Sequence, residues 1–113
     1  MVNVSLNSKF TSVVSGGLTG ATGITIDSQY KMELGKLVCY NLVLTSDHNM
    51  ANGDNVVSGL KVHYGGFNGV PTVPATNNAG SVAHFGVNDN GDLFAIGAIG
   101  SGKWRMSITY ICN

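Results

Sequence analysis

Residues Gly97 to Lys103, GAIGSGK, fit the first seven positions of the phosphate-binding pattern G-x-x-x-x-G-K-[ST]. That pattern binds nucleotides because glycine amides surround the phosphates, the lysine reaches them, a Ser or Thr hydroxyl binds magnesium, and a helix follows. Here Trp104 occupies the hydroxyl position, and the alternating residues after it are typical of a strand. We therefore predict a glycine-rich turn between two strands, and no nucleotide site.

The acidic side chains do not form a recognisable catalytic arrangement. Hydrolysis of a glycosidic bond generally needs two carboxylates about 5 to 10 Å apart, and although Glu33, Asp89 and Asp92 lie near expected strand ends, none belongs to a pair motif. No G-x-S-x-G elbow is present, and Ser and His residues lack the spacing for nucleophilic catalysis. The loop from Asp47 departs from the calcium-binding order at Ala51. We expect neither an enzyme nor a cofactor.

Charge and composition exclude further classes. The chain of 113 residues has six basic and six acidic side chains, scattered along the sequence, whereas nucleic-acid binders usually show a basic stripe. No segment approaches the roughly twenty apolar residues of a membrane span. The sixteen glycines and many Asn, Ser and Thr residues favour turns over helices. We predict one all-β domain that binds neither nucleic acid nor membrane.

The last residues, KWRMSITYICN, give the clearest structural signal. Apolar residues alternate with polar ones, which predicts a half-buried terminal strand with one face in the core, namely Trp104, Met106, Ile108, Tyr110 and Cys112. The same kind of signal predicts further strands at Phe10–Val14, Thr22–Tyr30, Met32–Leu34, Lys36–Thr45, Val56–Val62, Val82–Val87 and Asp92–Ile99. A turn is expected at Gly35-Lys36. Asn90-Gly91 is the strongest hairpin signal, because both residue types tolerate positive φ. This number of short strands predicts a compact antiparallel Greek-key barrel or a jelly-roll-like sandwich.

Two polar segments interrupt the strands. Ser46 to Asn55 is expected to be a loop, and the segment from His63 to Ser81, with two prolines, is expected to be a longer one. Loops of that length without secondary structure are uncommon in small domains and are often functional.

The predicted strands carry apolar residues on both faces, as with Leu37, Cys39 and Val43 on one side of the Lys36–Thr45 strand. The hairpin residues Leu93, Ala95 and Ile99 indicate the same. Either a subunit interface or a second layer within one subunit would cover such an outer surface.

Cys39 and Cys112 both fall in predicted strands. Neither has a Cys or His at metal-ligand spacing, so no zinc site is expected. A disulfide would be geometrically feasible between neighbouring strands, but we expect two buried, reduced thiols in a protein folded in a reducing compartment.

The order of these elements resembles the C-terminal head domain of tailed-phage receptor-binding proteins, particularly those of the lactococcal siphophage type. The resemblance covers about Thr22 to Asn113, and its matching pieces are the turn and strand Gly35–Leu42, the proline-containing middle loop, the hairpin around Asn90–Asp92 and the segment Ser101–Ile111. It implies an antiparallel barrel, a homotrimer, and recognition of saccharide on the cell wall of a Gram-positive host.

The resemblance also sets expectations for organisation. Residues 1–113 would be one receptor-binding head, with residues 1–20 a linker or first strand after a stem that this sequence does not contain. Through that stem the head would join other tail or baseplate proteins at the tip of the virion, after folding in the cytoplasm of the bacterial host. A structural trimerisation or virion-decoration module without its own ligand is the alternative, and a glycan-cleaving enzyme is disfavoured.

Saccharide recognition implies aromatic faces packed on C–H surfaces and a few polar groups that fix hydroxyls. The candidates chosen by chemistry and position are His63, Tyr64, His84, Asp92, Trp104 and Arg105. Each has a structural alternative: Trp104 shares a face with core residues, and His84 lies mid-strand where a buried histidine is common. Arg105 points away from the core, where it binds an anionic ligand or pairs with an acid such as Asp92.

Overall fold

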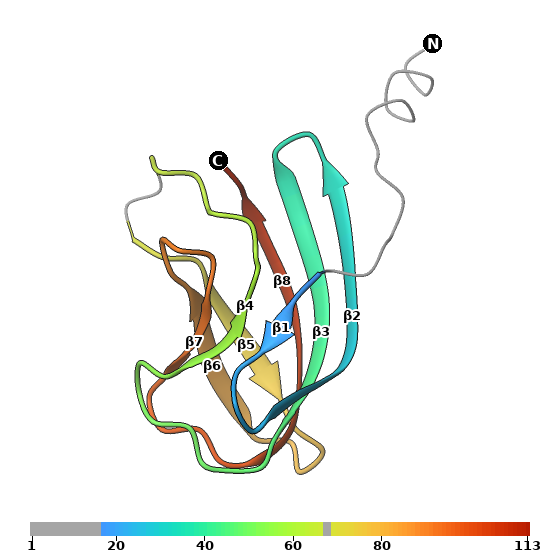
Figure 1. Cartoon of the computed structure of the whole chain (residues 1–113), viewed down its shortest axis with the longest axis vertical. Coiled ribbons are helices and arrows are strands. Elements are labelled where there is room, and N and C mark those ends of the chain that lie inside the picture. The colour runs from blue at the N-terminus through green and yellow to red at the C-terminus, as the bar shows by residue number, and fades with distance from the viewer. Residues whose placement is uncertain (1–16, 67–68) are drawn as a thin grey trace.

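The computed structural model describes residues 17–66 and 69–113, which form a nearly closed antiparallel barrel without helices (Figure 1). The eight strands are β1 (Thr19–Gly20), β2 (Ile24–Leu34), β3 (Leu37–Ser46), β4 (Asn55–Ser58), β5 (Thr72–Thr76), β6 (Val82–Val87), β7 (Leu93–Ile96) and β8 (Gly102–Ile111). They lie in the order β1-β4-β7-β6-β5-β8-β3-β2. The all-β prediction is confirmed, and the strand predicted at Phe10–Val14 lies outside the described residues.

Within the described part of the chain, no helix is long and apolar enough to cross a membrane.

The alternation of the terminal strand is confirmed. Every second residue of β8 points into the barrel, where Trp104, Met106, Ile108 and Tyr110 are buried, and Cys112 continues the same face. Strand β3 pairs with β8 along its whole length and contributes its own buried stripe of Val38, Tyr40, Leu42 and Leu44. These two long strands form the centre of the core. The predicted connection between two strands is present, but it spans Gly97 to Ser101, because Gly102 and Lys103 already belong to β8.

One side chain bridges the gap between the two end strands of the sheet. Strands β1 and β2 are the two ends of the sheet, and the Gln29 amide on β2 bridges them. Its Oε1 accepts a hydrogen bond from the Leu18 amide at 2.7 Å, and its Nε2 donates to the Leu18 carbonyl at 3.2 Å. Because a glutamine amide offers the same donor and acceptor as a peptide unit, Gln29 replaces the missing strand pairing.

Replacing Gln29 with alanine is expected to lower the free energy of unfolding by about 1 to 3 kcal/mol, because both Leu18 backbone groups lose partly buried partners. Urea unfolding measures the loss, and hydrogen exchange of the Leu18 amide locates it. Gln29→Leu is the matched control for size, and it should show the same faster exchange. Unchanged exchange at Leu18 in both variants would contradict this role of the side chain.

Strand β2 departs from the predicted alternation. The sequence places Ile24, Ile26, Ser28 and Tyr30 on one face, but a bulge shifts the pairing with β3 between Ile26 and Ser28. Ile26 therefore pairs with buried Leu44, whereas Ser28 pairs with the outward-facing Val43. A bulge inserts one extra residue, so all side chains beyond it change sides.

The middle loop is also not structureless, because β5 lies inside the segment His63 to Ser81. Pro74 hid this strand from sequence reasoning, since a proline within a run argues against a central strand. Strand β5 pairs with β6 over five residues but with β8 only through Ala75 and Thr76. Pro74 lies beyond that short ladder with β8, so the lost donor is tolerated there.

The predicted β6–β7 hairpin is present, but its turn has a different conformation. Among the described residues only glycines have positive φ, so Gly91 (φ 81°) adopts it and Asn90 does not. Instead, the Asn88 side chain accepts hydrogen bonds from the amides of Asn90 and Asp92 at 2.9 and 3.0 Å. A Cβ at position 91 would overlap the Leu60 carbonyl oxygen, so this position requires glycine for close approach as well as for φ.

The two sets of residues that suggested a covered outer surface have different environments in the structure. Leu93, Ala95 and Ile99 are buried in the core of this domain, so they do not indicate an interface. On β3 the outward side chains are less covered: Leu37 is exposed, and Cys39 and Val43 are half-buried.

The two cysteines are free thiols. Cys39 pairs in register with Thr109, whose side chain is exposed, whereas Cys112 belongs to the buried face of the terminal segment. The two side chains therefore lie on opposite faces of one sheet. This arrangement prevents a disulfide within one chain.

Candidate functional site

A polar groove of about 370 Å³ lies between the β5–β6 turn and the loop that joins β7 to β8. The turn contributes Asn77 and Ser81, the loop contributes Ser101, and strand β6 contributes His84. Trp104, at the start of β8, also lines it. The groove thus combines His84 and Trp104, two residues that are distant in sequence and were both predicted as ligand-binding.

Trp104 is mainly a core residue, since only 4% of its surface is exposed. Its indole Nε1 donates a hydrogen bond to the Gly100 carbonyl at 2.9 Å, which fixes the ring against the β7–β8 loop. Of the two roles considered for this side chain, packing is the one seen here. The ring supports the groove wall and offers no free face for stacking.

His84 has the opposite environment. Its side chain is exposed on the outer face of β6, between Pro74 of β5 and Ile96 of β7. Of the two alternatives considered for His84, the buried one does not apply, because strand β6 points its even-numbered residues outward as far as His84. An exposed imidazole at the edge of a polar groove is available to both donate and accept hydrogen bonds.

The β5–β6 turn links this groove to Arg105. Asn77 holds the turn with its Oδ1, which accepts hydrogen bonds from the amides of Ala79 and Ser81 at 3.1 and 2.9 Å. The next residue, Asn78, accepts a 2.6 Å hydrogen bond from an Arg105 guanidinium nitrogen. Arg105 therefore does not pair with Asp92 as considered above, and an amide orients its guanidinium instead.

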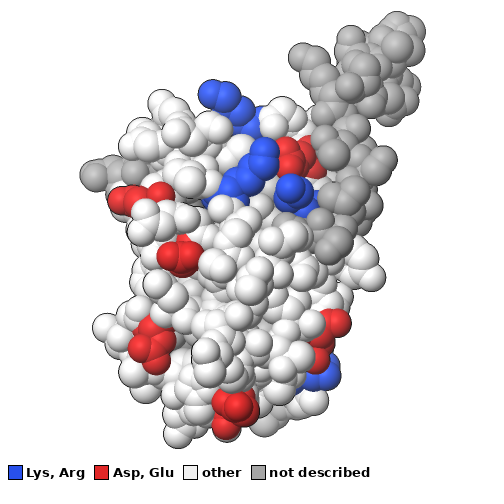
Figure 2. Space-filling view, in the orientation of Figure 1, with Lys and Arg blue, Asp and Glu red and all other residues white. Residues whose placement is uncertain are grey.

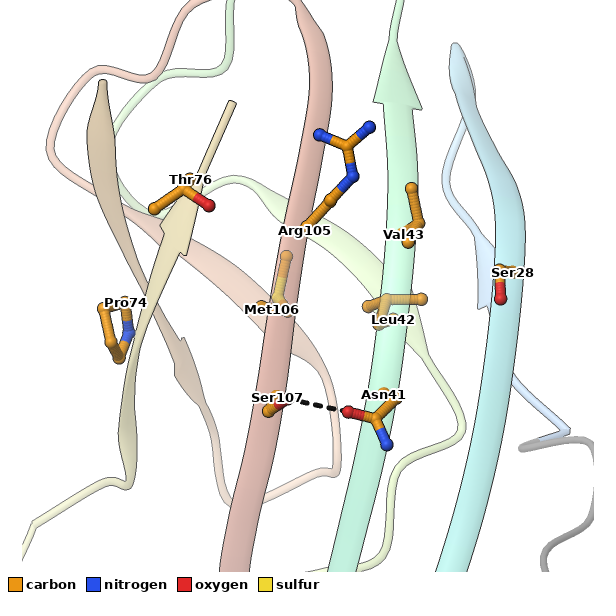
Figure 3. Close-up of a pocket in the computed structure, with 9 residues that line it drawn as sticks. All are labelled: Ser28, Asn41, Leu42, Val43, Pro74, Thr76, Arg105, Met106 and Ser107. Carbon is orange, nitrogen blue, oxygen red and sulfur yellow. Dashed lines mark hydrogen bonds between the residues drawn. The ribbon is translucent and has the colours of Figure 1, made fainter. Parts of the chain in front are cut away.

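Arg105 borders a second, shallower depression of about 460 Å³ on the outer face of the barrel (Figure 3). Its floor is formed by neighbouring strands, where Ser107 donates a 2.7 Å hydrogen bond to the Asn41 amide oxygen. Ser28 and Thr76 extend the polar border to the strands on either side. This depression also offers hydroxyl, amide and guanidinium groups.

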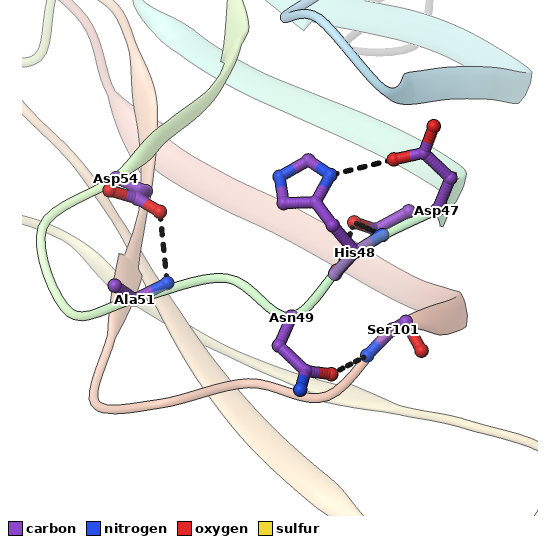
Figure 4. A network of polar contacts seen from close by, with 7 residues as sticks. Asp47, His48, Asn49, Ala51, Asp54 and Ser101 are labelled. Carbon is purple, nitrogen blue, oxygen red and sulfur yellow. Dashed lines mark hydrogen bonds and ion pairs between the residues drawn. The ribbon is translucent and has the colours of Figure 1, made fainter.

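The Ser46–Asn55 loop positions the β7–β8 loop through side-chain contacts. Asn49 accepts a hydrogen bond from the Ser101 amide at 3.1 Å (Figure 4), and Asn52 accepts one from the Gly97 amide at 2.7 Å. The loop is itself held by Asp54, which accepts from the Ala51 amide at 2.9 Å. The residue types of this loop show that it is polar, but nothing in its sequence indicates that it shapes a wall of the groove.

The remaining predicted residues lie at the other end of the barrel. His63 pairs in an isolated bridge with Cys112, eight residues along the chain from Trp104, which corresponds to about 26 Å of strand. His63 is buried, with ring nitrogens 2.9 Å from an Asp89 oxygen and 3.1 Å from the Tyr64 carbonyl, whereas Tyr64 itself is exposed. Asp92 follows Asp89 in the same turn. The six candidates therefore do not form one site.

At this upper end Tyr64, Pro71, Thr72 and Ile111 help to line a more apolar hollow of about 720 Å³. Nearby, the Glu33 carboxylate forms ion pairs with Lys61 at 3.1 Å and with Lys31 at 3.2 Å. Hydrogen bonds from Lys61 and Lys31 lower the pKa of this carboxyl group. Figure 2 shows basic side chains close to acidic ones near one end of the molecule, and most of this face is uncharged.

Tyr110 closes the core below these charges. It stacks on Tyr40 with ring centroids 6.4 Å apart, and its hydroxyl donates to the Lys61 carbonyl at 2.5 Å. Burial, assisted by neighbouring Tyr40 and Cys112, raises the pKa of Tyr110 well above the ordinary value. The folded protein therefore retains this proton at pH values where the unfolded chain, with a tyrosine pKa of about 10, releases it.

This difference predicts that stability falls as the pH rises above about 10, because the unfolded state then binds fewer protons than the folded state. Tyr110→Phe should be less stable at pH 7 by roughly 1 kcal/mol for the lost hydrogen bond, yet lose less stability between pH 9 and 11. Denaturant unfolding at each pH measures both effects. Tyr64→Phe, at an exposed position, is the control, and equal alkaline losses in Tyr110→Phe and the unsubstituted protein would contradict the assignment.

No group of three or more His, Cys, Asp or Glu residues suited to a metal ion occurs in residues 17–66 and 69–113. None of the three hollows described above is lined by an Asp or Glu side chain. Together, these observations define a small antiparallel β-barrel with three surface hollows, two of them bordered by polar side chains.

Comparison with known proteins agrees with that class. No protein-family model matches the chain, and no curated protein matches its sequence. A solved structure, the receptor binding protein (gp15) of Listeria phage PSA, matches with a TM-score of 0.68 over 99% of this chain and 71% of that chain, at 15% sequence identity. The chain therefore has the fold of a phage receptor-binding protein. The lactococcal type stays a prediction, since this match comes from a Listeria phage.

Proposed function

We propose that this chain is the head domain of a phage tail receptor-binding protein that binds cell-wall saccharide of a Gram-positive host. The observation that carries the proposal is the match in fold to the Listeria phage receptor binding protein over nearly the whole chain. In this proposal the head acts as a homotrimer at the tail tip of the virion, joined through a stem to other tail or baseplate proteins. Several weak sites then bind one cell wall together.

The polar groove beside His84 is the best candidate for the saccharide site. Its volume of about 370 Å³ lies near the lower end of ordinary ligand pockets, which suits one or two sugar rings. Asn77, Ser81 and Ser101 offer amide and hydroxyl groups, and His84 adds an imidazole. Arg105 lies across the same turn and is held by Asn78, so a longer glycan that crosses the turn would contact both.

Binding without cleavage fits the chemistry of these surfaces. Glycoside hydrolysis generally needs two carboxylates about 5 to 10 Å apart at the bond, and none lines the three hollows. A purely structural trimerisation or decoration module remains the second candidate, and the exposed apolar residues Leu37 and Ile111 favour it. Such a module would assemble but bind no saccharide.

His84→Ala and Arg105→Ala are expected to weaken binding to isolated cell walls by roughly ten- to a hundredfold per site while the fold is kept. Both side chains are exposed, so their removal opens no core cavity, and a hydrogen bond to a charged group contributes about 1.5 to 3 kcal/mol. Sedimentation of labelled protein with cell walls measures the affinity, and circular dichroism monitors the fold.

The control is Lys36→Ala, which removes an exposed cation in the β2–β3 turn and should leave binding unchanged. Tyr64→Ala tests the other end of the barrel. Loss of binding in Tyr64→Ala but not in His84→Ala would move the site to the apolar hollow. Absence of cell-wall binding by the unsubstituted protein, across hosts of the expected class, would favour the structural module.

A further inference from the structure

The outer face of the sheet beside His84 carries no Asp, Glu, Lys or Arg side chain. Two rows of residues cross β5, β6 and β7 in register, and the second continues onto β4, namely Pro74–His84–Ile96 and Thr72–Gly86–Phe94–Asn55. These residues point outward, because the alternate positions of the same strands, such as Phe85 and Ala95, are buried in the core. Strands β5, β6 and β7 lie side by side (Figure 1), so the rows form one continuous surface next to the polar groove.

Phe94 lies across this surface, over a glycine of the neighbouring strand. A Cβ at position 86 would lie 2.7 Å from Phe94 Cζ and 3.3 Å from Ile96 Cδ1, so no side chain fits beneath the ring. Gly86 does not have a positive φ, so glycine serves here for close approach and not for an unusual backbone. Gly86 is buried, whereas Phe94 itself is only half-buried. The ring therefore packs on the sheet and remains accessible from solvent.

The groups around the ring match those that bind sugars. Asn55, the neighbour of Phe94 in register on β4, is exposed and offers an amide donor and acceptor. Thr72 offers a hydroxyl at the other end of the row. Saccharides pack their C–H faces on aromatic rings, while amides and hydroxyls fix their hydroxyl groups. Trp104 was expected to supply the aromatic face, but its ring is buried and leaves this role unfilled.

Phe94 lies within reach of a glycan held in the groove. His84 and Ile96 both line the groove. The row that contains Phe94 is two residues further along β6 than the row that contains His84, which corresponds to about 7 Å of strand. Adjacent rings of one glycan chain therefore reach both His84 and Phe94.

We infer that Phe94 is a further binding residue of the proposed saccharide site, on which one sugar ring packs its C–H face while His84 contacts the next ring. This inference rests on the proposed function and extends its site from the groove onto the outer face of β6 and β7. It also limits the sugar that binds there. A hydroxyl directed at this surface would lose its water without gaining a partner from the side chains of Phe94, Ile96 or Pro74, so the bound ring presents C–H groups on that face.

Packing within the protein is the alternative role of Phe94. An aromatic ring that covers a glycine on the next strand stabilises a sheet without any ligand. Phe94→Leu separates the two roles, because leucine still covers Gly86 with apolar atoms but has no ring face. A purely structural role lowers the unfolding midpoint and leaves the affinity of the folded protein unchanged, whereas a binding role lowers the affinity.

Sedimentation with isolated cell walls should show that Phe94→Leu weakens binding by about two- to tenfold per site, while circular dichroism shows that the fold is kept. Asn55→Ala should weaken binding by a similar factor of about two to ten, because it removes a neutral hydrogen bond to the sugar. Tyr64→Leu is the matched control, since it removes an exposed aromatic ring at the other end of the barrel and should leave binding unchanged. Full binding by both Phe94→Leu and Asn55→Ala, or an equal loss in Tyr64→Leu, would overturn the inference.

Gly86→Ala tests the position of the ring without removing any group that a sugar would contact. The added Cβ would meet the Phe94 ring, so the ring must move and the affinity should fall. Gly65→Ala is the control, because a Cβ at position 65 meets no atom within 4 Å and Gly65 does not have a positive φ. Equal affinities of the two glycine variants would overturn the inference.

Phe94→Trp gives a direct signal from the same surface. Its emission should shift when glycan released from the same cell walls is added, whereas the emission of the unsubstituted protein, from buried Trp104, should stay nearly constant. Unchanged emission of Phe94→Trp at saturating glycan would contradict contact with the ring. Cell-wall binding that is equal in Phe94→Leu and the unsubstituted protein would overturn this inference alone, whereas absence of binding by the unsubstituted protein would overturn the proposed function and this inference with it.

Discussion

Trp104→Ala is expected to lower the free energy of unfolding by about 3 to 5 kcal/mol, the usual loss when a buried aromatic side chain is truncated. Trp104 is 4% exposed, and its indole also holds the Gly100 carbonyl at the edge of the groove. Thermal unfolding should show the loss as a decrease in the midpoint of roughly 4 °C or more per kcal/mol. Saccharide binding should fall as well, because the β7–β8 loop loses its support.

The conservative variant Trp104→Phe separates packing from recognition. It retains an aromatic ring but loses the hydrogen bond to Gly100, so its stability should lie between those of the alanine variant and the unsubstituted protein. If Trp104→Ala keeps its unfolding midpoint and loses only binding, the ring serves the ligand by stacking and its assignment to the core is wrong.

A multivalent cell-wall fragment is expected to compete with cell binding at a concentration about 10² to 10⁴ lower, per sugar unit, than a small sugar of the same composition. A single shallow site exchanges well-hydrated hydroxyl contacts for similar protein contacts, so its own affinity is weak. Linked sites raise the apparent affinity without any new contact. Competition assays with labelled protein and whole cells measure both concentrations.

Leu37→Glu supplies the control for this effect. Its substitution lies on the outer face, away from His84 and the groove, so the single site should be intact. Leu37 is an exposed apolar residue, so a glutamate there is expected to disrupt contact between copies of the chain, and in the resulting monomer the advantage of the multivalent fragment should largely disappear. Equal potency of the two competitors against the unsubstituted protein would show that avidity is not the mechanism.

Much of the fold was predictable from local patterns. Alternation in β8 identified the buried stripe from Trp104 to Cys112, and the turn at Gly35-Lys36 and the hairpin before Leu93 were placed correctly. These features depend on neighbours in sequence, namely side-chain alternation and the turn preferences of glycine and asparagine. The resemblance to phage receptor-binding heads agreed with the fold for the same reason, since it rested on the order of such elements.

The site was predictable only in part. The residue types expected for saccharide recognition were present, but the barrel separates His63, Tyr64 and Asp92 from His84, Trp104 and Arg105 by most of the length of β8. The spacing of residues in the sequence does not show which strand ends lie together at the same end of a barrel. The support of the groove by Asn49 and Asn52 likewise depends on contacts between loops far apart in the chain.

The amino-acid pattern alone is enough to predict an all-β protein with a terminal strand fixed in its core, because period-two alternation and turn residues act locally. Which faces of the strands are buried depends on the folded barrel. The bulge between Ile26 and Ser28 turns Lys31 and Glu33 inward and Tyr30, Met32 and Leu34 outward, and the pairing order places Leu93 and Ala95 in the core. A shift of one residue reverses every side chain that follows, and the register that sets it comes from strands brought together by folding.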